Sequence, residues 1–183
     1  MKSLNPKINI ISFLEYLSVE KRLAENTILS YRRDLESLER FISRHKAKTI
    51  ESATRTEIQD FISSDFKKGL SARSIQRKVS SIRAFFYFLQ ERKATKSNPA
   101  KNIRTPKTRS NLPRTIDPDQ MTRLLRNSGK TFFEIRDKTM LEIFYSCGIR
   151  LSELVRLNLK DISLKNSSLR VLGKGNKERI LPI

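Results

Sequence analysis

The strongest constraint on the fold is a break near the middle of the chain. Between Thr95 and Ile116 the apolar residues lose helical spacing, and three prolines disfavour helical backbone at the residues before them. The sequence Asp117-Pro118-Asp119-Gln120 then predicts the start of a new helix, with Asp117 as N-cap, proline at the first helical position and glutamine at the third. We therefore predict two domains, residues 1–94 and 117–183, joined by a basic linker of residues 95–116.

Apolar spacing predicts four helices in the first domain. The first covers residues 8–22, and the second begins at a cap on Asn26 or Thr27. The third follows a capping-box pattern at Thr54, and Ser71 caps the fourth. An apolar stripe crosses this last helix at Ile75, Val79, Ile82, Phe86 and Leu89. We expect these helices to close into a compact bundle.

The fourth helix and the linker are strongly basic. Between Lys67 and Arg114 there are 14 Lys and Arg residues and one acidic residue, Glu91, whereas a solvated helix face usually mixes both signs. Ordinary solvation is the alternative for each residue, but for the face as a whole we expect contact with DNA phosphates and groove edges. The candidate contact residues are Arg32 and Arg33 in the second helix, Arg73, Ser74, Arg77, Lys78 and Ser81 in the fourth, and Lys101, Arg104 and Lys107 in the linker.

Three consecutive aromatic residues, Phe85, Phe86 and Tyr87, offer another way to bind a nucleic acid, because bases stack on aromatic rings. Phe86 lies on the apolar stripe, however, and the other two flank it. We therefore expect core packing for the trio.

Composition narrows the partners and the compartment. Lys and Arg number 38 against 19 Asp and Glu, and the net charge of +19 favours a polyanion, DNA or RNA, over a membrane surface. Because the chain has no apolar run of about 18 residues and no leader-type cleavage site, we expect a cytoplasmic protein without a membrane partner. A single cysteine, Cys147, and a single histidine, His45, exclude an internal disulfide and a zinc cluster. We expect no metal and no cofactor, and Cys147 as a small core residue.

The last part of the chain places an arginine at a tight corner. Gly148 can end the preceding helix in a left-handed conformation, so that Arg150 follows directly at the turn. Glu153 comes one helical turn later, where its carboxylate can orient the guanidinium. Taken alone, Arg150 is an ordinary surface arginine.

A β-hairpin is predicted beyond this corner. Residues 169–172 alternate like a strand, Gly173 and Gly175 bracket a turn, and residues 177–183 begin a return strand, so Lys174 lies at the tip. The sequence around Lys174 lacks the spacing and the Ser or Thr of a P-loop and the third glycine of a dinucleotide loop. We therefore expect no nucleotide hydrolysis.

Two segments together, GIRLSEL and LGKGNKERILPI, resemble the first half of the catalytic domain of tyrosine recombinases, and most of all the bacterial Xer recombinases. The phrases NTILSYRRDL and LSARSIQRKVSSIRAFFYFL are similar to the SAM-like core-binding domain of that family. The resemblance implies a mainly α chain, in which a four-helix DNA-binding domain precedes the helices and hairpin of an α+β catalytic domain. It implies that Arg150 grips the scissile phosphate, Glu153 holds Arg150, and Lys174 reaches the cleavage site and protonates the leaving 5′ oxygen.

The family's other catalytic groups, including the tyrosine that forms a 3′-phosphotyrosyl link, lie after the hairpin. The tyrosines here, at positions 16, 31, 87 and 145, all precede it, so we assign no nucleophile and expect this chain alone to be inactive. Two interpretations remain open: the front portion of a truncated recombinase, or a non-catalytic module that occupies recombination sites or complements a separate fragment. The family's recombinase tetramer on two DNA sites is unsupported here, because the C-terminal docking helix is missing.

Overall fold

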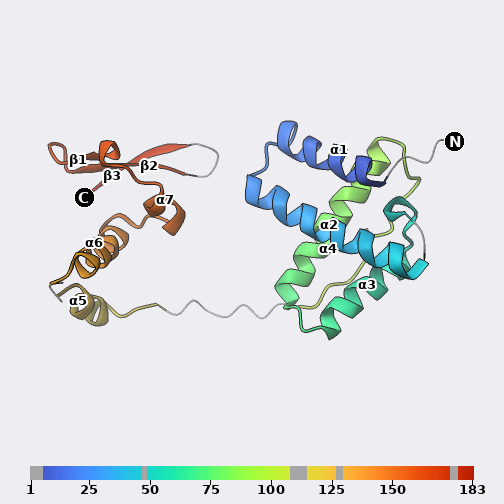
Figure 1. Cartoon of the computed structure of the whole chain (residues 1–183), viewed down its shortest axis with the longest axis horizontal. Helices are drawn as coiled ribbons and strands as arrows, with labels where there is room; N and C mark the ends of the chain where they lie inside the picture. Colours follow the sequence, from blue (N-terminus) through green and yellow to red (C-terminus); the bar gives the residue numbers. More distant parts are fainter. Residues whose placement is uncertain (1–5, 47–48, 108–114, 127–129, 174–176) are drawn as a thin grey trace. The chain divides into compact units, whose positions relative to one another are not determined.

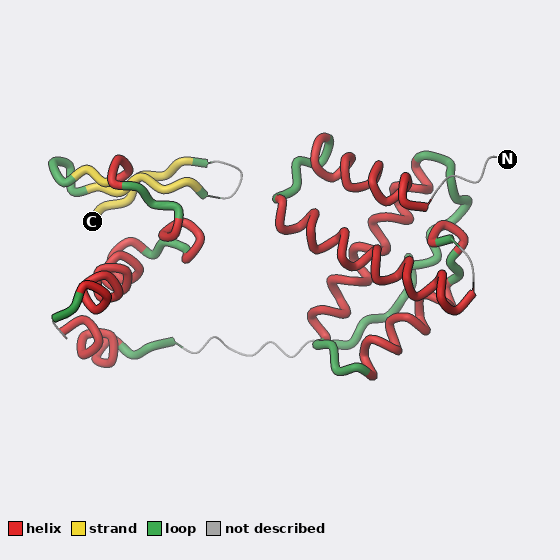
Figure 2. The backbone as a smooth tube through the Cα atoms, in the orientation of Figure 1, coloured by secondary structure: helices red, strands yellow, loops and turns green. Residues whose placement is uncertain are grey.

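The structure is a computed structural model, which describes residues 6–46, 49–107, 115–126, 130–173 and 177–183. The chain divides into two compact units, Met1–Ser110 and Asn111–Ile183, and each is treated by itself. Figure 1 labels the helices and strands. Figure 2 shows helices and loops in the first unit, and strands beside helices in the second.

The first unit contains the four predicted helices. They are α1 (Pro6–Val19), α2 (Glu25–Lys46), α3 (Arg55–Lys67) and α4 (Ala72–Glu91), with a 3-10 turn at Ile50–Ser52 between α2 and α3. The predicted caps of α3 and α4 are confirmed: Thr54 forms a capping box with Glu57, and the Ser71 hydroxyl accepts from the Ser74 N–H. The predicted cap of α2 is wrong, since Thr27 and Ile28 donate their N–H groups to the Ala24 carbonyl and are already helical.

The apolar stripe of α4 lies in the centre of the bundle, where α4 packs against α1, α2 and α3 (Figure 1). All five predicted stripe residues are buried, and each such burial contributes about 1.5–3 kcal/mol. Phe85 and Phe86 are fully enclosed, as expected for core residues. Tyr87 is 56% exposed, so the prediction of core packing is wrong for this residue, which lies off the stripe.

The first part of the predicted linker packs on the bundle. Ala100 and Ile103 are buried in the same core as the four helices. The Asn98 side chain donates to the Arg83 carbonyl at 2.9 Å, and Nε of Arg83 donates to the Ala100 carbonyl at 3.3 Å. Helical periodicity could not reveal this packing, because an irregular segment can bury isolated apolar residues without any repeat.

The second unit combines helices with a small antiparallel sheet. Its helices are α5 (Pro118–Arg126), α6 (Phe132–Cys147) and α7 (Leu151–Val155), followed by a 3-10 turn at Leu159–Asp161. The strands β1 (Ile162–Ser163), β2 (Ser168–Leu172) and β3 (Glu178–Pro182) pair in the order β1-β2-β3. The predicted hairpin is β2 and β3, and β1 is an additional short strand. The mainly α fold class with an α+β second part is therefore confirmed.

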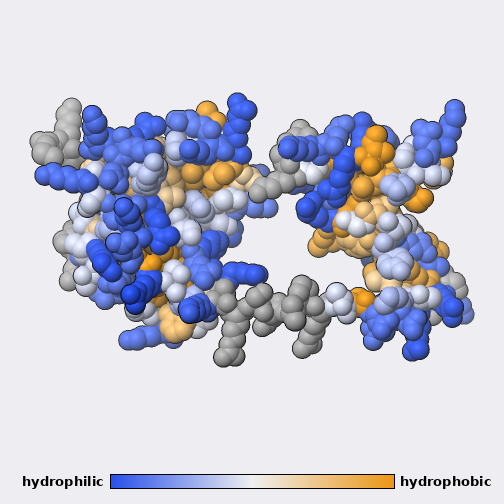
Figure 3. Space-filling view, turned by 180° about the vertical axis from the view of Figure 1, so that it is seen from behind, coloured by the Kyte–Doolittle hydropathy of each residue, from blue (hydrophilic) through white to orange (hydrophobic). Residues whose placement is uncertain are grey.

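The core of the second unit is small. Among its described residues, Ile149, Leu169 and Val171 are the buried apolar side chains, and Cys147 is only half-buried beside them. Other apolar side chains remain in contact with solvent, including Phe132, Phe133, Leu151, Val155 and Leu159. Figure 3 shows apolar surface, in orange, running over this unit. In the described part of the chain, no helix is both long enough and apolar enough to cross a membrane.

Candidate nucleic-acid interface

Most of the candidate cations of the first unit reach solvent. Arg32 and Arg33 are exposed on α2, Arg73 is exposed on α4, and the side chain of Arg77 is 43% exposed. Cations in these places can neutralise phosphates without any rearrangement of the bundle. Ser74, also on α4, is half-buried, and its hydroxyl lies 3.0 Å from that of Ser71, so part of its hydrogen-bonding capacity is used within the helix start.

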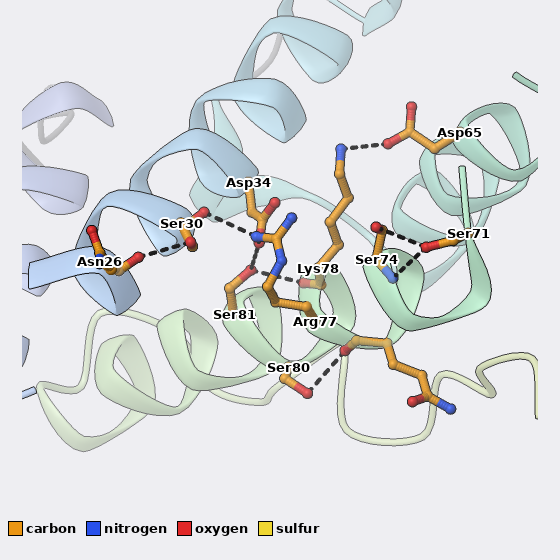
Figure 4. Close-up of polar contacts among 11 residues, drawn as sticks. Asn26, Ser30, Asp34, Asp65, Ser71, Ser74, Arg77, Lys78, Ser80 and Ser81 are labelled. Atoms are coloured by element: carbon orange, nitrogen blue, oxygen red, sulfur yellow. Dashed lines mark hydrogen bonds and ion pairs between the residues drawn. The ribbon is translucent and has the colours of Figure 1, made fainter. Parts of the chain in front are cut away.

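Arg77 is held against α2 by two acceptors. Its Nη1 donates to Oδ2 of Asp34 and, at 3.3 Å, to the Ser30 carbonyl (Figure 4). The Asp34 side chain is 2% exposed, and burial raises its pKa, although the hydrogen bond and the charge of Arg77 act in the opposite direction. Sequence reasoning did not single out Asp34.

Lys78 and Ser81 differ from the predicted exposed contact residues, because both are buried inside the bundle. Nζ of Lys78 is 2.5 Å from Oδ2 of Asp65 on α3 and lies over the Phe61 ring. The Ser81 hydroxyl is buried and donates to Asp34 at 3.2 Å. In Figure 4 the neighbours Arg77 and Lys78 extend from α4 toward different helices, α2 and α3. These contacts give Lys78 and Ser81 a role in holding the bundle together.

Lys101, Arg104 and Lys107 are exposed on the segment that packs along the bundle. The segment is tied down near its end as well, since Nε2 of Gln76 donates to the Pro106 carbonyl at 3.0 Å. Its cations are therefore presented from a backbone anchored to α4.

In the second unit, the predicted corner carries Arg150. Gly148 ends α6 with φ of 58°, a left-handed conformation that glycine adopts without strain. Arg150 is the N-cap of α7, and its side chain is 68% exposed. Its N–H donates to Oε2 of Glu153 at 2.8 Å, and Nη1 donates to Oε1 at 3.1 Å. The structure therefore brings these two predicted residues together with the guanidinium facing solvent.

Glu153 is the buried centre of this corner. Its side chain is 3% exposed. Its pKa lies below the usual value, first because it accepts the Arg150 N–H, next because it accepts a hydrogen bond from the Arg150 side chain, and then because of the charges of both neighbouring arginines. The second of these, Arg179 on β3, donates to Oε2 at 2.9 Å. Sequence reasoning missed Arg179. It lies two residues before Leu181, and because side chains alternate along a strand, both point to the same, partly buried face of β3.

Lys174, the third predicted catalytic residue, lies outside the described residues. The residue before it, Gly173, approaches the corner closely. A Cβ added there would lie 3.6 Å from both Nη1 of Arg179 and Oε1 of Glu153, and 3.4 Å from the Lys177 carbonyl. The start of the hairpin turn therefore lies against the carboxylate that holds Arg150. Within the described ranges, no three His, Cys, Asp or Glu residues are grouped to hold a metal ion.

Comparisons with known proteins agree over both units. The family model of the phage integrase N-terminal SAM-like domain matches residues 10–93, and that of the phage integrase family matches residues 114–183. Tyrosine recombinase XerC of Escherichia coli (strain K12 / DH10B) is 40% identical over 171 residues, which are 93% of this chain and 57% of that protein. The chain thus spans little more than half the length of such relatives.

Solved structures share the fold at low sequence identity. A lambda integrase(75-356) dimer bound to a COC′ core site matches with a TM-score of 0.73 and 16% identity, over 96% of this chain and 61% of that one. The Tn1549 transposon integrase in complex with circular intermediate DNA matches with a TM-score of 0.64 and 20% identity, over 96% and 60%. With both domain models matched and 40% identity to XerC, this chain belongs to the phage integrase family of tyrosine recombinases.

Proposed function

We propose that this chain is the DNA-binding front portion of a site-specific tyrosine recombinase that works in the cytoplasm. The observation that carries the proposal is the exposed Arg150 held by the buried Glu153, in a chain 40% identical to tyrosine recombinase XerC. In this proposal the first unit binds duplex DNA through the exposed cations of α2, α4 and the segment after α4. The second unit presents Arg150 to the phosphate that is cleaved.

The chemistry assigned to these residues is charge stabilisation and proton transfer. A phosphodiester under attack gains charge on its non-bridging oxygens, and a fixed guanidinium such as that of Arg150 lowers the barrier. Glu153 keeps that guanidinium in place, and Lys174 protonates the departing 5′ oxygen. The proposal needs no metal or cofactor, and it assigns the nucleophilic tyrosine of the 3′-phosphotyrosyl link to none of the tyrosines of this chain.

Salt dependence tests the DNA-binding part directly. Cations that neutralise phosphates displace counterions, so the logarithm of the affinity falls with the logarithm of the salt concentration. If about six phosphates are neutralised, the slope is roughly −5. Fluorescence anisotropy with a labelled duplex at several NaCl concentrations measures this slope. Binding that is absent, or that does not change with salt, contradicts the proposal.

A further inference from the structure

Arg77 differs from the other candidate cations because a buried carboxylate holds it. The Asp34 side chain is 2% exposed and the Arg77 side chain is 43% exposed, so the pair runs from the interior of the bundle to its surface. A negative charge beside a DNA-binding cation weakens the attraction to a polyanion. The pair therefore requires an explanation other than charge alone.

The geometry leaves part of the guanidinium available. Among the described residues, Asp34 and the Ser30 carbonyl both engage Nη1 of Arg77, whereas Nε and Nη2 take no partner. A guanidinium is a rigid planar fork that can donate two parallel hydrogen bonds to a phosphate or to a base edge. Fixing one nitrogen against α2 restricts the directions in which the other two can point.

Asp34 is itself fixed from α4. The hydroxyl of the fully buried Ser81 donates to Oδ2 of Asp34 at 3.2 Å and also lies 2.9 Å from the Lys78 carbonyl (Figure 4). The carboxylate is thus held on one side by a serine of the helix that also carries Arg77. Such a carboxylate cannot swing out to follow a mobile arginine, so it limits the arginine's motion.

We propose that Asp34 is a positioning residue for DNA binding, which aims the guanidinium of Arg77 outward from the contact between α2 and α4. The Arg77 guanidinium is then already oriented when it contacts the duplex. The entropy of its side chain is therefore lost before binding and does not weaken the affinity. This inference rests on the proposed function, and it names a residue of that interface that does not itself touch the DNA.

A second ion pair in the same bundle, which is buried on both sides, serves as a matched control. Lys78 and Asp65 join α4 to α3, but the Lys78 side chain is only 10% exposed and presents no donor to a duplex. Replacing either Asp34 or Asp65 by Asn raises the net charge by one and leaves the side-chain volume nearly unchanged. Electrostatic attraction alone therefore predicts tighter DNA binding for both variants.

The experiment compares D34N, D65N, R77A and the double variant D34N/R77A by fluorescence anisotropy on one mixed-sequence duplex of about 30 base pairs at fixed salt. Positioning predicts that D34N binds about fivefold more weakly than the unsubstituted chain, despite its added positive charge, and that R77A binds about tenfold more weakly. D65N binds as tightly as the unsubstituted chain or more tightly. The double variant binds like R77A, because Asp34 acts only through Arg77.

Circular dichroism melting of each variant shows that the bundle is folded at the assay temperature. Binding by D34N that equals or exceeds that of the unsubstituted chain overturns the inference, and so does an additive loss in D34N/R77A. If the unsubstituted chain binds with the expected salt slope but R77A binds equally well, the inference fails and the proposed function stands. If the unsubstituted chain does not bind at all, both fail.

Discussion

Arg179 on β3 donates from Nη2 to Oε2 of Glu153 on α7 at 2.9 Å, across 26 residues of sequence. The other carboxylate oxygen of Glu153 lies 3.1 Å from Nη1 of Arg150. One buried carboxylate thus connects the corner that presents Arg150 to the strand that returns from the hairpin. The position of Arg150 depends on β3 as well as on its own helix.

This arrangement predicts the titration of Glu153. Because its pKa is lowered in the folded state, ionised Glu153 contributes stability above its ordinary pKa of 4.5, and the contribution is lost as the pH falls through the lower folded value. Side-chain carboxyl NMR should give a midpoint below 4.5. In R179A the midpoint should rise, since one of the charges that lower it is gone.

Glu134 provides the internal control for that titration. It forms a capping box with Thr131 at the start of α6, and hydrogen bonds from the Thr131 and Lys130 backbone lower its pKa. Its midpoint should also be low, but R179A should leave it unchanged. A Glu153 midpoint that R179A does not move would show that Arg179 has no part in holding the carboxylate.

The burial of Ala100 and Ile103 predicts where the first unit ends as a stable fragment. A fragment of residues 1–93 lacks both side chains and the hydrogen bonds around Arg83, whereas residues 1–107 retain them. The shorter fragment should be less stable by about 3 kcal/mol, mostly from lost apolar burial. Urea unfolding followed by circular dichroism measures the difference. Equal midpoints and slopes for the two fragments would mean that the segment after α4 adds nothing to the bundle.

Two aromatic residues of α4 should respond very differently to truncation. Phe85 is fully buried and packs edge-on against Phe13 at 5.5 Å between ring centres, so F85A should cost about 3–5 kcal/mol of unfolding free energy. Tyr87 is 56% exposed, so Y87A should cost less than about 1 kcal/mol. Thermal or urea unfolding of both variants compares them on the same helix. A similar loss in the two would contradict the described packing.

A nicked suicide duplex separates DNA binding from strand cleavage, because it traps a covalent intermediate whenever a nucleophile reaches the phosphate. We expect the 183-residue chain to form no covalent adduct with it, since the family resemblance assigns the nucleophile to none of its tyrosines. Denaturing electrophoresis detects an adduct as a band of reduced mobility. An adduct would overturn this assignment, and peptide mapping would identify the tyrosine used.

Local patterns predicted the helices, the caps at Thr54 and Ser71, and the pairing of Arg150 with Glu153, because these depend on residues within one or two turns of each other. The pairs Arg77–Asp34 and Glu153–Arg179 are 43 and 26 residues apart, and no periodicity links such partners. The same lack of a local signal explains why the sequence places Lys78 on the DNA-binding face although the structure buries it. A lysine beside an apolar stripe can point into the bundle when a carboxylate inside it can form an ion pair. For Lys78 that carboxylate belongs to Asp65, 13 residues earlier in the chain.

In the proposed complex, duplex DNA lies along the exposed cations of α2 and α4. Crosslinking from a photoreactive label on a single cysteine tests this placement of the DNA. In a C147S background, the cysteine replaces either Arg73 on α4 or Val19 on α1. Both positions are exposed, but α1 carries none of the candidate contact residues. We predict efficient crosslinking to DNA from position 73 and little from position 19. Equal crosslinking, or crosslinking mainly from position 19, would show that the duplex does not lie along the cations of α2 and α4.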